Sequence, residues 1–501
     1  MAIAGIVSKK GEEISSKIVD MLAIMTHTKN SIAAFSLNEE IISKETTKSL
    51  EQGNTKGLMS VGYCGYPNEK GEYSIKALQR EDGRIFIVGE GRTYFDRSDN
   101  QLKDRNYAIS TVETIAHVIE EEHIDLLKRL TNCLSRINGF FSLAILTKEG
   151  IIVSRDTIGV EPLYWGENED CCAIASERKA LWRIGIKDVK AFPPGNISLV
   201  SKNGCIFSQP SILKKSSRFN MNIDNAAQEL KSTLQRVITT YLGELDEIGV
   251  LFSGGIDSSL VAKMAGDLGL NVVLYTAGVE GSHDIDVAEK VADELGYDHY
   301  TNSIAFSSVE KYISKVVYAI EEERLMSVTV GFPLYAAAEL ASIQDNRLVL
   351  SGEGSDELFG GYSKYQRILQ KSNYERLDEE MWRDILLMSE VNLQRDSAIA
   401  KASNIELLPI YMDMKVVDLA MSLPPQLKVV DGMDTLRKQV LRRTAKMVNL
   451  PDDVIYLPKK AAQYGSGSYK AIRTVARIRG FKNPHDYIKA IFGEVFKGFI
   501  A

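Results

Sequence analysis

The second half of the chain alternates short apolar runs with longer segments of helical periodicity, and this alternation constrains the fold more than any other feature. The apolar runs lie at residues 247–252, 271–278 and 347–352. Strands that alternate with helices build a parallel, doubly wound sheet. We therefore expect an α/β domain over residues 222–501 that is mostly helical from about residue 365. Its periodicity predicts helices near residues 225–242, 284–295, 309–323 and 333–342.

The first half of the chain shows a different pattern. Short apolar and β-branched runs, such as residues 83–91, are separated by Gly, Asn and Asp, which is typical of strands joined by turns. Two segments, near residues 13–25 and 110–121, have helical periodicity. This pattern predicts a sheet-rich α/β sandwich over residues 1–210. A polar stretch at residues 214–222 is the expected linker to the second domain.

Charge and cysteine content exclude several classes of protein. Of the 501 residues, 60 are Lys or Arg and 67 are Asp or Glu, which gives a net charge of −7. A mildly acidic chain is a poor general binder of polyanions, and this argues against a nucleic-acid partner. The five cysteines form no CxxC pair, so we expect a reducing compartment with neither a disulfide scaffold nor a structural zinc site.

The two ends of the chain bear on location and partners. The start lacks the pattern of a signal peptide, and no apolar run reaches the roughly 18 residues of a membrane span. We therefore expect a cytoplasmic protein with no membrane partner. Residues 459–501 hold nine Lys or Arg against two acids. This basic tail is interpreted as a solvated helical face, with a positive wall near bound phosphates or an RNA contact as the sharper alternatives.

Residues 253–259, Ser-Gly-Gly-Ile-Asp-Ser-Ser, follow an apolar run and open a helix that extends to about residue 268. A helix N-terminus offers unpaired N–H groups that suit an anion, and Gly254 and Gly255 let the backbone approach a phosphate closely. The hydroxyls that could donate to phosphate oxygens belong to Ser253, Ser258 and Ser259. Asp257, a carboxylate beside an anion site, is best explained as a magnesium ligand. The competing interpretation is an ordinary strand–helix turn.

Residues 351–362, SGEGSDELFGGY, follow the next apolar run and crowd carboxylates and glycines into one loop. Clustered carboxylates repel each other unless a cation or a shared proton holds them. Asp356 suits a second metal ligand, and Glu353 suits an acid/base role. The competing interpretation is a solvated acidic turn.

At these two segments the sequence resembles the asparagine synthetase family, including its β-lactam and carbapenam synthetase relatives. The resemblance continues through MSLPPQLKVVDGMDTLRKQVLRR and PKKAAQYGSG. In the first half it includes RINGFFSLAIL, SRDTIGVEPLYWG and ASERKALW, so it spans most of the chain. It implies an N-terminal αββα sandwich of the glutamine amidotransferase type, followed by an ATP-pyrophosphatase domain. It also implies a homodimer.

The resemblance implies a mechanism as well. ATP would bind at residues 253–259, with Mg²⁺ held by Asp257 and Asp356. A substrate carboxylate would attack the α-phosphate, and ammonia or an amine would then displace AMP to give an amide. Leu251, Ser351 and Gly352 fall where the family contacts the nucleotide. Two catalytic residues are implied. Glu353 would orient or deprotonate the nitrogen nucleophile, and Lys460 would stabilise the negative charge of the transition state. Lys459 is the alternative to Lys460 if the alignment shifts by one residue.

The first half departs from the family pattern. Family glutaminases begin Met-Cys-Gly-Ile, and the exposed Cys attacks glutamine. Here position 2 is Ala2, so the nucleophile is missing. Three further family segments have changed. The family's Asn-Gly oxyanion pair reads Glu90-Gly91, and the other two segments are residues 27–30 and 110–113. We therefore expect no glutaminase activity, as in the β-lactam synthetases. This half would then be a scaffold, a relic, or the site of something else.

The acyl-acceptor side departs too. Thr329 stands where the synthetases usually place an Arg, and the Glu-Ala-Arg-x-Pro segment reads Glu-Leu-Leu-Pro at residues 406–409. Loss of Arg removes bidentate recognition of a carboxylate, which puts aspartate as the substrate in doubt.

Two other hypotheses for the function remain. A tRNA-modifying enzyme of the wider pyrophosphatase-loop class is supported by the basic tail. A non-catalytic scaffold descended from a synthetase is opposed by the retained Asp257, Asp356 and Lys460.

Overall fold

A computed structural model describes most of the chain and divides it into two compact units. The described residues are 1–27, 32–37, 40–44, 57–66, 74–80, 83–95, 107–120, 126–243, 245–430, 436–458 and 462–499. Unit 1 comprises Met1–Leu213 and Phe496–Ala501, and unit 2 comprises Lys214–Val495.

Unit 1 contains two antiparallel sheets, each with seven strands among the described residues. The first has the order β12-β10-β11-β1-β4-β2-β3, and the second has the order β14-β13-β9-β8-β6-β5, with β7 paired to β6. The strands of the first sheet are β1 (Ala2–Ser8), β2 (Ile32–Leu37), β3 (Glu40–Lys44), β4 (Met59–Gly65), β10 (Tyr164–Glu167), β11 (Cys171–Ala175) and β12 (Lys190–Ala191). Those of the second are β5 (Ile75–Arg80), β6 (Gly83–Phe95), β7 (Ile109–Ser110), β8 (Ile137–Leu146), β9 (Ile151–Arg155), β13 (Ile197–Ser201) and β14 (Gly204–Ser208).

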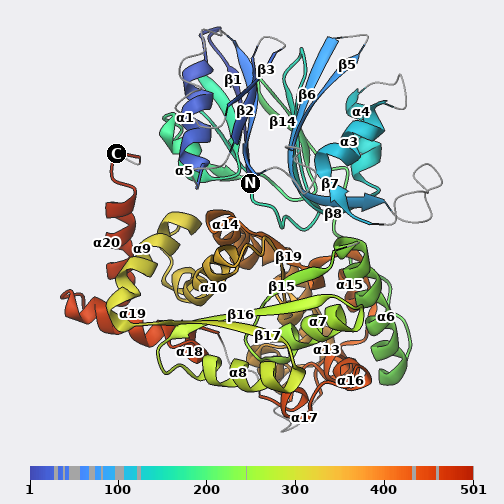
Figure 1. Ribbon diagram of the computed structural model, residues 1–501. Helices are drawn as coiled ribbons and strands as arrows, with labels where there is room; N and C mark the ends of the chain where they lie inside the picture. Colours follow the sequence, from blue (N-terminus) through green and yellow to red (C-terminus); the bar gives the residue numbers. More distant parts are fainter. Residues whose placement is uncertain are drawn as a thin grey trace. The chain divides into compact units, whose positions relative to one another are not determined.

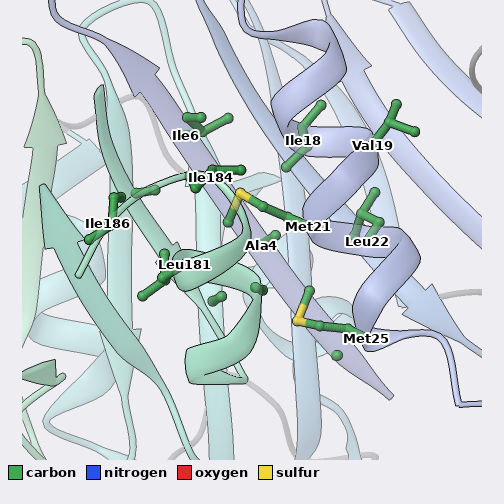
Figure 2. Close-up of a cluster of buried hydrophobic side chains, with 14 of the residues drawn as sticks. Ala4, Ile6, Ile18, Val19, Met21, Leu22, Met25, Leu181, Ile184 and Ile186 are labelled. Atoms are coloured by element: carbon green, nitrogen blue, oxygen red, sulfur yellow. The ribbon is translucent and has the colours of Figure 1, made fainter. Parts of the chain in front are cut away.

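The alternation of side chains along the strands of unit 1 creates three apolar cores. In β1, Ala4 and Ile6 pack against helices α1 (Ser15–Met25) and α5 (Arg178–Arg183), as Figure 2 shows. The intervening Ile3 and Val7 face the second sheet. Helices α3 (Thr111–Glu120) and α4 (Leu126–Leu134) cover the outer face of the second sheet. The result is the expected αββα sandwich, although α4 and α5 are too short to have been predicted.

Unit 2 is built on a five-stranded sheet with the order β17-β16-β15-β18-β19, in which all pairs are parallel. Figure 1 shows helices packed around this sheet. The strands are β15 (Glu247–Leu251), β16 (Asn271–Val279), β17 (Asp298–Ile304), β18 (Leu348–Ser351) and β19 (Glu406–Pro409). The predicted doubly wound α/β fold is therefore confirmed. The edge strands β17 and β19 were not predicted, because β17 is polar and β19 has only four residues.

Helices make up most of the remainder of unit 2. Those before β18 are α6 (Ile223–Leu242), α7 (Ile256–Asp267), α8 (His283–Leu295), α9 (Val309–Ile320) and α10 (Leu325–Ile343). Those after it are α11 (Ser355–Phe359), α12 (Ser363–Lys371), α13 (Tyr374–Met388), α14 (Gln394–Ala402), α15 (Met414–Ser422), α16 (Gln439–Met447), α17 (Asp452–Ile455), α18 (Ala462–Gly465), α19 (Ser468–Ile478) and α20 (Pro484–Val495). Short 3-10 turns lie at Phe306–Ser308, Ile410–Met412 and Pro425–Leu427, and a π-helical segment, η3, at Ser389–Leu393.

Helix α10 differs from the prediction, because it begins eight residues before Pro333 and runs through it. Proline has no N–H to donate to the carbonyl four residues earlier, which is that of Thr329. Here the Ser468 hydroxyl donates to the Thr329 carbonyl oxygen at 2.6 Å. The carbonyl is thus satisfied from outside the helix, and the helix does not break at the proline.

Helix α10 also corrects the expectation that no apolar run is long enough to span a membrane. By length and composition its 19 residues could cross a bilayer. However, 56% of its most apolar window is buried in the protein, and a core helix passes the same test. We infer no membrane span from it.

The polar stretch at residues 214–222 lies along unit 2. Lys215 and Arg218 both pair with Asp378 of α13, a buried carboxylate. The backbone N–H of Phe219 donates to the carbonyl of Ser422 at 3.0 Å. This segment is therefore anchored to unit 2 by its own ion pairs and backbone contacts.

Candidate active site

Two loops of unit 2, residues 253–259 and 351–362, begin at the same edge of the sheet and are called the signature loops below. Strands β15 and β18 are parallel neighbours, with Gly249 opposite Val349 and Val250 opposite Leu350. The residues that end the two strands, Leu251 and Ser351, therefore lie side by side. After β15 the chain turns toward β16, and after β18 it turns toward β19 on the other side. Such a topological switch point is where open α/β sheets bind their ligands.

The loop from β15 to α7 presents the N-terminus of α7. Gly254 has a φ of +69°, and a Cβ there would lie 2.9–3.0 Å from Val287 and Ala288, so only glycine fits. The Ser253 N–H donates to Ser258 Oγ at 3.3 Å, and the Gly255 N–H donates to Ser253 Oγ at 3.4 Å. Gly255, at the N-cap, provides no side-chain cap. Ser259, by contrast, is fully buried, and its hydroxyl has no hydrogen-bond partner within the described ranges.

The second loop touches the first at Gly352. A Cβ at Gly352 would lie 3.0 Å from both Asp257 Cβ and Ser258 N. The Ser351 hydroxyl accepts a hydrogen bond from the Glu353 N–H at 3.3 Å, which fixes the start of this loop. The close approach explains why the loop has glycine at this position.

A buried lysine that the sequence analysis did not single out joins the two loops. Lys438 Nζ donates to Asp257 Oδ1 at 2.6 Å and to Ser355 Oγ at 2.9 Å, and it also pairs with Asp356. Its side chain is 1% exposed. Lys438 immediately precedes α16, and its φ of +64° is unusual for a residue other than glycine. In the sequence, Lys438 could have been found only from its place in MDTLRKQVLRR, a segment that resembles the asparagine synthetase family.

The packing around this lysine is tight. A Cβ at Gly361 would lie 1.8 Å from Asp356 Oδ1 and 2.3 Å from Lys438 Cε. The Tyr411 hydroxyl donates to the backbone carbonyl of Asp257 at 3.2 Å. The two carboxylates are thus held close together from several directions.

Asp257 and Asp356 were predicted to hold Mg²⁺, and their arrangement fits that ion. Both carboxylates converge on one cation, the ammonium of Lys438. Magnesium in phosphate-binding sites commonly takes one or two carboxylates and completes its shell with phosphate and water oxygens. Within the described ranges, no group of three or more His, Cys, Asp or Glu is arranged so that it could hold a metal by itself. Such an ion would therefore depend on a phosphate ligand.

Glu353 lies in a cluster of buried charges. Burial raises the pKa of the Glu353 carboxyl well above its usual value, and nearby Asp396 and Glu357 add to this effect. Arg395 opposes it, while its own Nε donates to Asp396 Oδ1 at 2.7 Å. A carboxyl with a raised pKa holds a proton more readily than an ordinary glutamate, which suits the predicted acid/base role. Neither Arg395 nor Asp396 carries a motif signal in the sequence.

Glu357, on the same loop, is also buried. Its pKa is raised to about 7 by burial and by the charge of Asp356. One carboxylate oxygen, Oε1, accepts hydrogen bonds from the Tyr362 hydroxyl at 2.6 Å and from Asn392 Nδ2 at 3.0 Å.

Lys459 and Lys460, the lysines predicted near the transition state, lie outside the described residues. The segment that follows them reaches the same edge of the sheet. The Val279 N–H at the end of β16 donates to the Ser466 carbonyl at 2.9 Å. Gly465 lies so close to Asp284 that a Cβ there would be 1.9 Å from Asp284 Oδ1.

In unit 1 the position of the missing nucleophile is enclosed. Ala2 is 1% exposed and lies opposite Cys64 of β4. The Ser176 hydroxyl accepts from the Ile3 N–H at 2.8 Å and donates to Glu90, whose side chain is buried. A buried carboxylate therefore lies two hydrogen bonds from the start of β1.

His27 belongs to a second buried charge cluster. Its Nε2 lies 2.7 Å from Glu177 Oε1, and Lys179 pairs with the same carboxylate. Burial alone would raise the pKa of Glu177, but His27 and Lys179 outweigh it and lower the pKa to about 2. Residues 28–30 lie outside the described part. All five cysteines are free.

Comparisons with known proteins agree with this architecture. The asparagine synthase family model matches residues 229–376 and 369–480, and a glutamine amidotransferase domain model matches residues 69–183. A putative asparagine synthetase (glutamine-hydrolyzing) of Methanocaldococcus jannaschii is 31% identical over 534 aligned positions, which cover 96% of each chain. The asparagine synthetase (glutamine-hydrolyzing) of Asparagus officinalis is 28% identical over 78% of this chain and 67% of its own.

Similarity to solved structures is weaker. The glutamine phosphoribosylpyrophosphate amidotransferase from B. subtilis is 18% identical, with a TM-score of 0.36, over 60% of this chain and 65% of that one, just under two thirds. The family models and the M. jannaschii relative carry the assignment: the chain belongs to the asparagine synthase family and is an ATP-dependent carbon–nitrogen ligase that forms AMP and diphosphate.

Proposed function

We propose that this ligase adenylates a small carboxylic acid and couples it to ammonia or an amine taken from solution, without hydrolysing glutamine. Adenylation is supported by one observation: the two loops meet at Lys438, which holds Asp257 and Asp356 together. The diphosphate end of ATP would lie at the N-terminus of α7, where unpaired N–H groups favour an anion. Leu251, Ser351 and Gly352 border that place and would contact the nucleotide.

Asp257 and Asp356 are the residues that would hold Mg²⁺. The ion would neutralise charge on the diphosphate leaving group. The substrate carboxylate oxygen attacks the α-phosphorus, the bond to the bridging oxygen breaks, and diphosphate leaves with the electron pair. The amine nitrogen then attacks the acyl carbon, and AMP leaves. Glu353 accepts a proton from the nitrogen, and Lys460 is proposed to stabilise the developing negative charge.

Two observations support the proposed absence of glutaminase activity. Ala2 has no group that could attack glutamine. The buried Glu90 places a carboxylate where the resemblance implies an oxyanion-binding Asn, and a fixed negative charge there would repel the developing anion. Unit 1 would then serve as a scaffold, and the nitrogen donor would enter unit 2 directly.

A panel of carboxylic acids tests this function. Diphosphate release and AMP formation are measured with purified protein, ATP, Mg²⁺ and ammonium chloride, one acid at a time. At least one acid is expected to give equal amounts of AMP and diphosphate. Formation of ADP in place of AMP, or diphosphate release that no acid stimulates, would contradict the proposal. Replacement of ammonium by glutamine is expected to give no product and no glutamate.

A further inference from the structure

A cavity with no assigned role opens beside the second signature loop. Its volume is about 390 Å³, and it lies between α12, α13 and the π-helical segment η3 in unit 2. Leu387, Met388 and Val391 form an apolar wall, and Glu357 and Asn392 also line it. Leu387 and Val391 are 39% and 46% exposed, so the cavity is reached from the surface. Ammonia alone would not need a space of this size.

The inner end of the cavity carries a buried carboxyl oxygen that has no hydrogen-bond donor within the described ranges. Glu357 is 3% exposed, and its Oε1 already accepts from Tyr362 and Asn392. Its other oxygen, Oε2, is buried and has no hydrogen-bond partner within the described ranges. A buried acceptor without a donor is costly, and more so when the group can be charged. A ligand with a cationic N–H donor would remove this cost.

The outer part of the cavity carries the guanidinium of Arg367, which pairs with no carboxylate of the described residues. Arg367 is exposed, and the partner of its guanidinium is the hydroxyl of Ser363, at 3.3 Å. The neighbouring Lys364, by contrast, pairs with Asp384 at 2.6 Å. Arg367 is therefore available to a ligand carboxylate, which its planar fork of donors matches.

Polar contacts lead from the inner end of the cavity toward the acid/base candidate, Glu353. Asn392, which donates to Glu357, accepts from Arg395 Nη1 at 3.4 Å. Both Arg395 and Glu357 are electrostatic neighbours of Glu353. A nitrogen bound at Glu357 would therefore approach the group proposed to deprotonate the nucleophile.

We propose that this cavity binds the nitrogen donor, and that the donor is an amphipathic primary amine of the α-amino-acid type. Its ammonium contacts Glu357, its apolar side chain lies on the Leu387–Val391 wall, and its carboxylate reaches Arg367. This inference rests on the proposed function. In the coupling step the nitrogen forms a bond to the acyl carbon and the acyl–phosphate C–O bond breaks. AMP leaves with the electron pair, and the ammonium gives up two protons, one to Glu353 and one to solvent.

Three matched probes test the binding mode by calorimetry on the full chain without ATP. L-Leucine carries both charges, 3-methylbutylamine lacks the carboxylate, and 4-methylpentanoate lacks the ammonium. L-Leucine is expected to bind, the amine to bind roughly tenfold more weakly, and the acid more weakly still. Binding of the acid as tight as that of L-leucine would overturn the inference, as would no binding of either ammonium-bearing probe.

Two variants and a control locate the site. Arg367→Gln is expected to weaken L-leucine binding roughly tenfold and to change 3-methylbutylamine binding by less than about twofold. Glu357→Gln is expected to weaken both ammonium-bearing probes. Lys371→Gln removes an exposed cation from the same helix, outside the cavity lining, and is expected to change neither. Equal effects of Arg367→Gln and Lys371→Gln would contradict the assignment, and unfolding temperatures confirm that each variant is folded.

Turnover experiments separate this inference from the proposed function. With a carboxylic acid that supports diphosphate release, L-leucine is expected to give the N-acyl-leucine, identified by mass spectrometry, in competition with ammonium. If ammonium-dependent amide formation proceeds but L-leucine neither binds nor is acylated, the inference about the cavity fails and the proposed function stands. If no acid supports diphosphate release with either nitrogen source, the proposed function itself fails.

Discussion

Lys438 Nζ lies 2.6 Å from Asp257 Oδ1, although 181 residues separate them in the sequence. The same ammonium pairs with Asp356, so one buried cation balances two carboxylates from two different loops. Without it the carboxylates would repel each other, and the loops would not hold their present approach. The proposed site is thus preassembled by an ion cluster that Mg²⁺ and nucleotide would have to enter.

Removal of this cation is expected to destabilise unit 2. Lys438→Met removes the ammonium that pairs with the buried Asp257 and the partly exposed Asp356, and loss of one member of a buried ion pair typically costs about 3–5 kcal/mol. Urea unfolding should show this loss, while Lys446→Met, an exposed lysine of α16, should change stability by less than about 0.5 kcal/mol. Because the freed carboxylates suit a divalent ion, millimolar Mg²⁺ should raise the melting temperature of Lys438→Met more than that of the wild type. Equal shifts would argue against metal binding at this pair.

The contact of Gly361 with the same cluster predicts a strong effect of a single methyl group. Gly361→Ala places a Cβ 1.8 Å from Asp356 Oδ1. The loop must move, so diphosphate release is expected to fall at least about tenfold, together with a stability loss of about 1–3 kcal/mol. Gly493→Ala is the control, because a Cβ there meets nothing within 4 Å in helix α20 and should stabilise slightly. Unchanged activity in Gly361→Ala would show that the loop is not held as described.

Lys428 predicts a particular dependence of stability on pH. It is fully buried, its Nζ has no hydrogen-bond partner within the described ranges, and burial lowers its pKa to about 7. In the unfolded chain the pKa returns to about 10.4. Between these values the unfolded chain binds more protons, so this lysine makes the free energy of unfolding rise with pH.

Lys428→Met tests that dependence. The variant should be more stable than the wild type near pH 6.5, by up to a few kcal/mol, because the wild type must bury a charge or give up a proton. The advantage should shrink steadily as the pH rises toward 10. Urea unfolding at several pH values measures it, and the same difference at pH 6.5 and pH 9.5 would contradict the assigned shift.

The Ser468–Thr329 hydrogen bond predicts a non-additive pair of mutations. Ser468→Ala leaves the Thr329 carbonyl without the donor that replaces the missing N–H of Pro333, at an expected cost of about 1–3 kcal/mol. In a Pro333→Ala background the alanine N–H can donate to the same carbonyl, so Ser468→Ala should cost much less. A double-mutant cycle of unfolding free energies measures the difference. Additive costs would mean that Ser468 acts elsewhere.

Restoring the missing nucleophile is not expected to restore glutaminase activity. Ala2→Cys supplies a thiol, but the buried Glu90 remains where the developing anion would lie. Glutamate release from glutamine should stay at the background of the wild type. Release by Ala2→Cys alone, measured with a coupled glutamate assay, would show that the rest of the pocket is intact.

Local pattern determined much of this protein. The strand–loop–helix segment at residues 247–268 and the loop at residues 351–362 could be predicted, because apolar runs, glycines and caps act within a few residues. The sheet-rich sandwich of unit 1 could be predicted from short apolar and β-branched runs broken by Gly, Asn and Asp, while its αββα arrangement was implied by the resemblance. The family resemblance added the order of the two units.

Tertiary structure decided the rest. Lys438 and Asn392 act through Asp257, Asp356 and Glu357, which lie on other loops and meet them only when the sheet and its helices pack. The passage of α10 through Pro333 depends on Ser468, 135 residues later. Strand β17 is polar and becomes a strand because β16 offers it a paired edge. Propensity and periodicity act over a few residues, whereas these contacts depend on which distant surfaces the core brings together.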